Sequence, residues 1–297
     1  ALPIFFRHVK DGTRIVLVGD VNQLPSVGPG NVFRDMINSR IIPVTTLDVV
    51  FRQKNTSRIP VNAQKMLDYK TELDYGDDFA FYPAADAESC AKVVCDLYKD
   101  LIKTYGVENV QVLSPFRKKS EAGVNSLNEK LWDLANPKIP GTRELQANGL
   151  VYRKGDKVIH SRNKNGISNG DIGFIVDIVE DEDGAQAARI DFGDGRIVEY
   201  GAGELEMVEH SYATTVHKSQ GSEYSVVILP WLPAFYMMLR QNILYTAVTR
   251  AKEKVIIVGS KQALCMAILN NSSSMRNSQL AGRLAQEYDR RMAEKAS

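Results

Sequence analysis

The chain has 297 residues, 44% of them hydrophobic, and its 37 basic residues nearly balance 36 acidic ones, leaving a formal net charge of +1. This length predicts two domains, each large enough for its own hydrophobic core. The balanced charge excludes a global basic field, so any nucleic-acid site has to be local. The cysteines, Cys90, Cys95 and Cys265, lack metal-ligand spacing, and so sparse and odd a set predicts a reducing, cytoplasmic location.

The N-terminal residues 1–6 read as the interior of a helix and do not begin with Met. We therefore expect a fragment of a longer protein, with a cleaved mature N terminus as the alternative. No apolar run approaches membrane-spanning length, and no signal peptide opens the chain. These features predict a protein that has no membrane partner.

An apolar run at residues 14–18 is typical of a strand buried in a parallel sheet. The loop 19–30 follows it, and in open α/β sheets ligands bind just beyond the carboxyl ends of the strands. Asp20 and Gln23 lie in this loop. Asp20 is equally well explained as the cap of the next helix. The Gln23 amide favours a functional role, because it can donate to a phosphate oxygen and accept from a water.

The middle of the chain alternates between helix and strand patterns. Helical spacing is found at residues 31–39, 59–67, 87–105 and 124–134, strand patterns at 44–47 and 110–113, and a polar loop at 69–83. Arg52 follows the strand pattern at 44–47 and is either a solvated surface residue or a side chain that projects into a cleft.

A basic turn at residues 114–120 follows the strand pattern at 110–113. It begins Ser114-Pro115-Phe116-Arg117 and combines cations for phosphate with an aromatic ring for stacking. The alternative is a solvated charge run beside a core phenylalanine, and this alternative is favoured for Phe116.

Between residues 150 and 208 the predicted strands become short and are separated by Gly, Asn and Asp turns. About five short strands without a long helix predict a small SH3-like barrel inserted into the α/β domain. The basic first portion of the barrel either guides a phosphate backbone, which we favour, or solvates the barrel face. The residues concerned are Arg153, Lys154, Lys157, His160, Arg162 and Lys164.

The stretch 214–223 is crowded with polar side chains and leads into the apolar run 226–229. Gly221 lies between them, where the backbone can turn sharply or approach a ligand closely. The ordinary alternative is a Ser/Thr/Gly turn before a strand. A helix predicted at 241–252 delivers Arg250 near its end, a strand is predicted at 254–259, and a polar linker and charged helix complete the chain.

Polar or basic clusters therefore lie beside predicted parallel strands, around Gln23, Arg52, Ser114 and Gln220, with Arg250 on the helix before the last strand. Amide, hydroxyl and arginine groups suit phosphoryl transfer, which needs positioning and positive charge rather than covalent chemistry from the protein. The sequence contains no Ser/His/Asp or Cys/His arrangement that would favour nucleophilic catalysis instead.

Five ordered blocks, VGDVNQLPSVGPG, FRQ, VLSPFRK, ATTVHKSQGSEY and LYTAVTRAKEKVIIVG, resemble motifs III to VI of RecD-like DNA helicases of superfamily 1 (group 1B). The resemblance covers nearly the whole chain. It implies an α/β fold in which a RecA-like parallel-sheet domain of the P-loop NTPase type, the second helicase domain, carries an SH3-like insertion. The implied domains are a remnant of the first RecA-like domain at 1–48, the second at 49–148 and 209–297, and the insertion at 149–208.

The resemblance also implies roles for single residues. Gln23 senses the γ-phosphate, and Arg52 and Arg250 act as arginine fingers. The implied nucleotide-binding residues are Asp20, Gln23, Arg52, Gly221, Glu223 and Arg250. The implied DNA-binding residues are Ser114, Pro115, Arg117, Thr215, His217, Lys218 and Ser219.

One part of the family pattern is absent, because the sequence contains no GxxxxGK[ST] and no Asp-Glu pair ends a strand before residue 14. We therefore expect this chain alone to be inactive. As part of a whole enzyme, the resemblance implies an ATP- and Mg²⁺-dependent helicase or translocase of recombination and repair. It implies 5′-to-3′ movement on single-stranded DNA, duplex junctions as substrates, and a RecBCD-type complex as a partner.

Two alternatives stay open at this point. The chain is the helicase segment of a conjugative relaxase, or it is an isolated, non-catalytic module that binds single-stranded DNA. The sequence carries no cluster of carboxylates typical of a nuclease.

Overall fold

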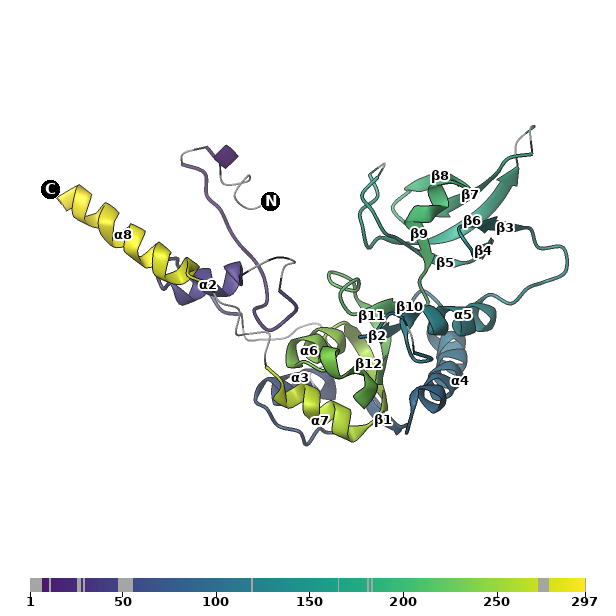
Figure 1. Cartoon of the computed structure of the whole chain (residues 1–297), viewed down its shortest axis with the longest axis horizontal. Coiled ribbons are helices and arrows are strands. Elements are labelled where there is room, and N and C mark those ends of the chain that lie inside the picture. Colours follow the sequence, from purple (N-terminus) through teal and green to yellow (C-terminus); the bar gives the residue numbers. More distant parts are fainter. Residues whose placement is uncertain are drawn as a thin grey trace. The chain divides into compact units, whose positions relative to one another are not determined.

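The computed structural model describes residues 7–10, 12–25, 28, 30–47, 56–118, 120–164, 166–180, 182, 184–271 and 278–296 (Figure 1). The chain divides into two compact units. The first joins Ala1–Leu47 to Ser274–Ser297, and the second is Asp48–Ser273. The C-terminal segment thus groups with the N-terminal residues, whereas the sequence placed it in the second RecA-like domain.

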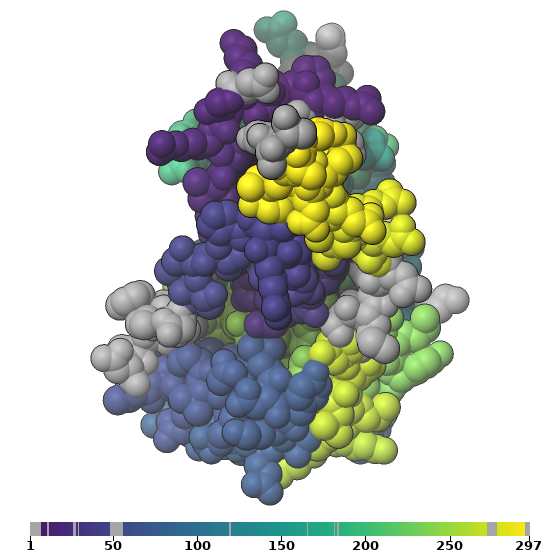
Figure 2. All heavy atoms as spheres, turned by 90° about the vertical axis from the view of Figure 1, so that its left-hand side faces the viewer, coloured from purple at the N-terminus to yellow at the C-terminus, as the bar shows by residue number. Residues whose placement is uncertain are grey.

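The first unit is built on two helices, α2 (Val32–Asn38) and α8 (Leu280–Ala296). They pack against each other, and Figure 2 shows α8 (yellow) lying on the segment that carries α2 (violet-blue). Arg34 of α2 donates from Nη2 to the backbone oxygen of Val21 at 2.7 Å, which ties the preceding loop to the helix. The helices predicted in these two regions are therefore confirmed.

The strands predicted at residues 14–18 and 44–47 are wrong, because neither segment forms a strand. Val16, Val18 and Leu47 are 84%, 90% and 88% exposed. A strand of a parallel sheet needs neighbouring strands to receive its backbone hydrogen bonds. The described residues of the first unit form no other strand, so these apolar runs have no sheet to join.

The second unit contains a five-stranded parallel sheet in the order β1-β12-β11-β2-β10. Its strands are β1 (Phe79–Pro83), β2 (Val110–Ser114), β10 (Ala213–Thr215), β11 (Tyr224–Trp231) and β12 (Ala251–Gly259). Every residue of β2 is buried, as is nearly all of β11, because helices cover both faces of the sheet. This is the predicted RecA-like architecture.

Helices lie on both sides of this sheet (Figure 1). One side carries α3 (Arg58–Leu67), α6 (Gln241–Val248) and α7 (Lys261–Leu269), and the other carries α4 (Ala87–Tyr105) and α5 (Val124–Ala135). Local sequence explains where α4 begins, since Asp86 and Ser89 form a reciprocal capping box. A short 3₁₀ helix, η2 (Pro233–Met238), connects β11 to α6.

Besides the short strand β10, two elements of this domain were not predicted. Residues 69–83 were predicted as a loop, but Phe79–Pro83 form strand β1 at the edge of the sheet. Only Phe79 of this strand is fully buried, so the strand lacks the long apolar run that marks its neighbours. The second element is α7, which follows β12 after one residue and was not predicted.

The insertion is an antiparallel five-stranded sheet in the order β8-β7-β6-β5-β9, accompanied by the hairpin β3-β4. Its elements are β3 (Glu144–Ala147), β4 (Leu150–Arg153), β5 (Lys157–His160), β6 (Ile172–Glu180), β7 (Gln186–Asp191), β8 (Ile197–Gly201), η1 (Glu204–Met207) and β9 (Val208–His210). Leu145 and Ala147 belong to the same core as Tyr152 and Ile190. The packed barrel therefore includes residues that precede the predicted start at 149.

A buried polar network joins the insertion to the parallel-sheet domain. The Asp156 carboxylate is fully buried, and its Oδ1 accepts hydrogen bonds from Trp132 Nε1 (2.7 Å), Asn136 Nδ2 (2.7 Å) and the Tyr212 hydroxyl (3.0 Å). Its Oδ2 accepts from the Arg153 backbone N–H at 2.7 Å. These bonds satisfy a charge that would otherwise be costly to bury.

Lys157 is also buried in this junction. Its Nζ donates to the backbone oxygens of Val107 (2.9 Å) and Val110 (3.2 Å). Burial, against a smaller opposing effect of Glu108, lowers the pKa of Lys157 to about 7. The lysine thus anchors β5 to the segment that leads into β2.

The interpretation that the basic first portion of the barrel guides DNA is wrong for three of its six residues and stays a prediction for Lys154, Arg162 and Lys164. Arg153, Lys157 and His160 are buried. Arg162 and Lys164 are paired with Glu206 and Glu204 of the insertion itself. The three buried side chains therefore serve packing and hydrogen bonding, whereas the two exposed ion pairs lie at the surface of the insertion. Among the described residues, no helix combines the length and apolar character needed to cross a membrane.

Candidate functional site

Two predicted site segments meet at the carboxyl edge of the parallel sheet. Strands β10 and β2 are neighbours, and Thr215 pairs in register with Ser114. The Ser114 hydroxyl is buried, donates to the Ala122 backbone oxygen at 3.0 Å and accepts from the Phe116 N–H at 3.2 Å. Ser114 therefore shapes the basic turn from inside.

The residues after β10 form a compact turn. The Thr215 hydroxyl oxygen accepts from the Lys218 N–H at 3.2 Å, and Ser219 donates from Oγ to the Val216 oxygen at 2.9 Å. Ser219 is fully buried, whereas His217 is exposed. Partial desolvation, and then the positive charge of Arg240, lower the pKa of His217 below its ordinary value. His217 is therefore neutral at pH 7.

A carboxylate lies between the two basic side chains of this edge. Glu209 of β9 accepts from Arg117 Nη2 at 2.6 Å and from Lys218 Nζ at 3.0 Å. Partial burial acts to raise the pKa of Glu209, but Lys218 and Arg117 together hold it below its usual value. Glu209 was not predicted as a site residue, because its position on an alternating strand of the insertion does not reveal which domain it faces.

A groove of about 920 Å³ opens beside the basic turn. Its lining includes Phe116, Arg117, Lys118, Ser120, Asn125 and Phe235. Phe116 is half-buried and stacks on Phe235, with ring centroids 5.5 Å apart and an interplanar angle of 17°. The stacked rings make the groove partly apolar, and its two cations, Arg117 and Lys118, are balanced by two lining carboxylates, Glu121 and Glu129.

Other predicted site residues lie at the opposite, amino edge of the sheet. Tyr224 and Ala251 pair in register where β11 and β12 begin. Arg250 immediately precedes β12 and is 4% exposed, and it donates to the backbone oxygens of Thr246 (Nε, 3.2 Å) and Ser222 (Nη1, 3.3 Å). Glu223 forms an ion pair with Lys252 at 3.3 Å.

The segment 215–223 therefore connects two edges of one sheet. It leaves the carboxyl end of β10 at Thr215 and reaches the amino end of β11 beside Arg250. The sequence predicts that the polar clusters lie at strand ends, but it does not separate the two edges. The structure brings Ser114, Thr215, Arg117 and Lys218 together at one edge, and Gly221, Glu223 and Arg250 at the other.

The remaining predicted site residues lie in the first unit or outside the described residues. Asp20 Oδ1 accepts from the Asn22 N–H at 2.8 Å, and its Oδ2 accepts from Gln23 Nε2 at 3.2 Å. Asp20 thus holds the Gln23 side chain within its loop. Arg52 lies outside the described residues. Among the residues that are described, no group of three or more His, Cys, Asp or Glu side chains is placed to hold a metal ion.

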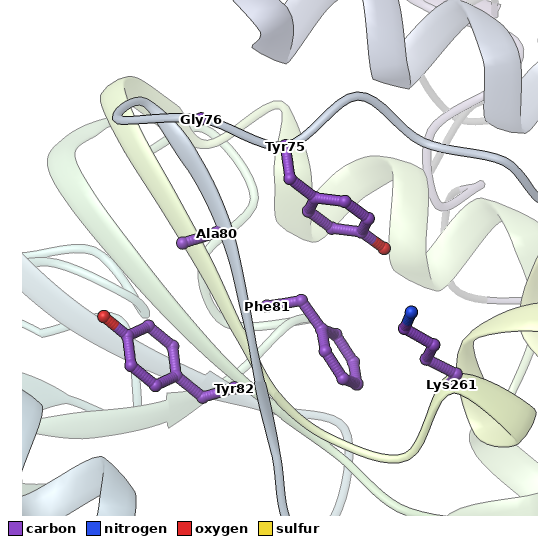
Figure 3. A pocket seen from close by; sticks show the side chains of 6 residues that line it. All are labelled: Tyr75, Gly76, Ala80, Phe81, Tyr82 and Lys261. Atoms are coloured by element: carbon purple, nitrogen blue, oxygen red, sulfur yellow. The ribbon is translucent and has the colours of Figure 1, made fainter.

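A smaller pocket, of about 330 Å³, lies at the outer strand β1 and contains none of the predicted site residues (Figure 3). Tyr75, Phe81 and Tyr82 line it, together with Lys261 of α7, whose Nζ lies 5.9 Å from the Phe81 ring centroid. Burial, and to a smaller extent Cys265, raises the pKa of Tyr75.

Three family models match parts of the chain. Residues 2–77 match an AAA domain, residues 127–192 match the SH3 domain of ATP-dependent RecD-like DNA helicases, and residues 210–258 match the UvrD-like helicase C-terminal domain. The second match falls on the inserted barrel and the third on β10 to β12. The matches therefore follow the order of the structural parts.

The chain is also similar to individual proteins. It is 32% identical to the ATP-dependent RecD2 DNA helicase of Deinococcus radiodurans over 93% of this chain and 36% of that protein. It is 26% identical to the conjugal transfer protein TraA of Agrobacterium fabrum over 82% of this chain and 22% of that protein. The crystal structure of Bacteroides Pif1 bound to ssDNA matches 89% of this chain and 66% of that chain, with 18% identity and a TM-score of 0.46. The chain thus spans about a third or less of the curated relatives named here.

Proposed function

Because the chain belongs to the RecD-like family of superfamily 1 DNA helicases, we propose that the protein is an ATP-dependent DNA helicase or translocase. Its proposed substrates are single-stranded DNA and duplex junctions, with 5′-to-3′ movement. We place it in DNA recombination and repair in the cytoplasm, with a RecBCD-type complex as a partner.

One observation carries this proposal. The segment 215–223 runs from the basic carboxyl edge of the sheet to the amino edge that holds Arg250. A helicase has to couple a nucleotide site to a DNA site, and coupling requires a physical element that both sites can bias. This segment contacts both groups of residues within one short stretch of chain.

The nucleotide side is assigned to Asp20, Gln23, Arg52, Gly221, Glu223 and Arg250. The Arg250 guanidinium suits charge that develops on a transferring phosphoryl group. Gln23 offers an amide for the γ-phosphate. ATP supplies the free energy for movement when it is bound, and the described residues offer arginine and amide donors for its phosphates. They do not offer a carboxylate cluster for Mg²⁺, so no step is assigned to the metal here.

The DNA side is assigned to Ser114, Pro115, Arg117, Thr215, His217, Lys218 and Ser219. Exposure divides five of these residues into two groups. Arg117 and Lys218 present charge at the surface, and His217 is exposed. Ser114 and Ser219 are buried and hold the two turns in shape. We assign phosphate contact to the first group and positioning to the second.

The decisive experiment is Arg250→Ala in the full-length protein. Loss of an arginine finger lowers the rate of phosphoryl transfer on the order of a thousandfold or more. We expect the kcat of DNA-stimulated ATP hydrolysis to fall by that amount. The Kd for single-stranded DNA should change by less than about threefold, because Arg250 is assigned to the nucleotide side and a lost DNA contact of about 1.4 kcal/mol would raise the Kd tenfold. Arg189→Ala, at a partly exposed barrel pair with Glu199, serves as the control. An Arg250→Ala enzyme with nearly wild-type turnover would refute the finger assignment.

A conjugative relaxase is the second candidate, and the similarity to TraA favours it. Such a protein would carry a DNA-nicking activity in addition to the helicase segment. Incubating the full-length protein with supercoiled plasmid and a divalent cation tests this directly. Site-specific relaxation supports a relaxase, and intact supercoiled plasmid supports a helicase alone.

An isolated binding module is the remaining alternative. It predicts single-stranded DNA binding without any DNA-stimulated ATP hydrolysis in the full-length protein. The affinity should be measured against salt concentration. Each phosphate contact on a single strand adds about 0.7 to the slope of log K against log salt, so a steep slope indicates a groove with several phosphate contacts and a shallow slope indicates few or none.

A further inference from the structure

We propose that Glu209 is a built-in competitor for DNA phosphates that weakens the grip of Arg117 and Lys218 on the strand. The inference rests on the proposed function, in which these two cations contact single-stranded DNA. It gives a role to a carboxylate of the insertion that the helicase motifs do not include.

Geometry places the Glu209 carboxylate where a phosphate would bind. Arg117 comes from the turn after β2, and Lys218 comes from the turn after β10. Both reach the same carboxylate, with N···O distances of 2.6 and 3.0 Å. A DNA phosphate would need the same N–H donors, because guanidinium and ammonium groups bind carboxylate and phosphate oxygens in the same way.

The backbone fixes Glu209 in this position. In β9 the flanking residues Val208 and His210 are buried, and Glu209 pairs in register with Ile159 of β5. Because side chains alternate between the two faces of a strand, burying the flanking residues turns Glu209 outward, toward the basic turns. The carboxylate is therefore presented by the insertion, whereas both cations belong to the parallel-sheet domain.

Charge and exposure make the contact exchangeable. The side chains of Arg117, Lys218 and Glu209 are 42%, 22% and 33% exposed, so solvent and a DNA strand can reach them. The three groups together carry a net charge of +1 instead of +2. Arg117 is the most exposed member, and exposed ion pairs are weak, so we expect a polyanion to displace the carboxylate from Arg117 first. Arg117, but not Lys218 or Glu209, also lines the 920 Å³ groove, so a strand can approach the cluster from the Arg117 side.

The test compares Glu209→Gln with the wild type in the full-length protein, using a fluorescent oligothymidine as the probe. Removing the competing charge should tighten binding by about three- to tenfold at low salt. It should steepen the slope of log K against log salt by about 0.7, the value of one phosphate contact. Glu199→Gln makes the same chemical change at the exposed pair with Arg189 on the barrel, and should change neither quantity.

The alternative is that Glu209 only holds the two cations in place, and then Glu209→Gln weakens binding or leaves it unchanged. Either result overturns the proposal. Thermal melting checks the fold, and Glu209→Ala provides a second variant if the glutamine variant melts early. In a Lys218→Ala background the gain from Glu209→Gln should shrink to less than half, and an undiminished gain would also overturn the proposal.

Failure of the proposed DNA site gives a different result from failure of the competitor role. If Arg117→Ala and Lys218→Ala leave affinity and salt slope at wild-type values, these cations do not contact DNA and the site assignment itself is wrong. If both variants weaken binding but Glu209→Gln does not strengthen it, the site assignment stands and only the competitor role fails.

Discussion

The guanidinium of Arg250 donates from Nη1 to the backbone oxygen of Ser222, 3.3 Å away, and this bond joins the end of α6 to the turn before β11. A second bond, from Nε to the Thr246 backbone oxygen, holds the same side chain to the preceding helix α6. A shift of the turn therefore has to break or carry the Ser222 contact. Because of this direct connection, we expect substitutions in the turn to change the rate of phosphoryl transfer.

Gly221 is predicted to be intolerant of a side chain for backbone reasons alone. Its φ is +86°, and a Cβ built on it meets nothing within 4 Å. Gly221→Ala should therefore lower the free energy of unfolding by about 1–2 kcal/mol, the cost of a left-handed conformation for an L-residue. Urea unfolding measures this change. Gly203, whose φ is −70° and whose Cβ position is equally open, is the matched control, and equal effects at both glycines would contradict the argument.

The buried Lys157 predicts a specific pH dependence of stability. Its pKa is lowered from an ordinary 10.5 to about 7, so between these values the unfolded chain binds a proton that the folded chain does not. The free energy of unfolding should therefore rise with pH over this window, because the unfolded state holds more protons. Lys157→Met should flatten that rise in urea melts.

The control for this prediction is Lys154→Met, at an exposed lysine three residues earlier. It should leave the slope of stability against pH unchanged. A Lys157→Met variant that keeps the full wild-type slope would show that the lysine is not the titrating group.

The Asp156 network predicts a large loss of stability from a small chemical change. Asp156→Asn keeps the shape of the side chain, but with its oxygen facing Trp132, Asn136 and Tyr212 its NH₂ donor meets the backbone N–H of Arg153, which loses its acceptor. Breaking one member of a buried charged network costs about 3 kcal/mol. Asp100→Asn, at an exposed pair with Lys103, should change the free energy of unfolding by less than about 0.5 kcal/mol. Similar losses at both positions would argue against the network.

Substitutions at His217 and at Lys218 are predicted to differ in their effect on the salt dependence of DNA binding. Desolvation and Arg240 keep the pKa of His217 below 6.5, so it is neutral at pH 7 and above. At neutral pH His217→Gln should leave the salt slope of DNA binding unchanged, whereas Lys218→Ala should reduce it by about 0.7. As the pH falls through the lowered pKa, His217 gains charge, and only then should wild type bind DNA more tightly than His217→Gln. A slope change in His217→Gln at neutral pH would contradict this assignment.

The sequence predicted secondary structure best for the amphipathic helix with strong periodicity and for the strands that are buried on both faces of the sheet. The helix at 87–105 and the apolar runs at 110–113, 226–229 and 254–259 all take the predicted form. The apolar run at 14–18 shows the limit of that reasoning, since hydrophobicity describes a tendency that needs neighbouring strands to become structure. Strand β1 shows the converse, because its place beside β12 makes it a strand without a strong pattern.

The candidate site was predictable in its residues but not in its geometry. Motif order placed Ser114, Thr215 and Arg250 on the candidate list, but only strand order shows that the first two lie together while Arg250 lies at the other edge. Ser219 was proposed for DNA, and its hydroxyl is buried against Val216; its contact with DNA stays a prediction. Glu209 could not be found at all, because no sequence pattern connects it to Arg117, which lies in a distant part of the chain.

The connection between β9 and β10 consists of only two residues, Ser211 and Tyr212, and both are fully buried. A linker this short and this well packed leaves β9 and β10 little freedom to move independently. We therefore expect a mechanical load on the insertion, such as a duplex pressing against the barrel, to be transmitted directly to Thr215. In that case resistance met by the barrel would first reach the turn after β10, at the edge of the sheet that carries the proposed DNA contacts, and only through the segment 215–223 the edge that holds Arg250.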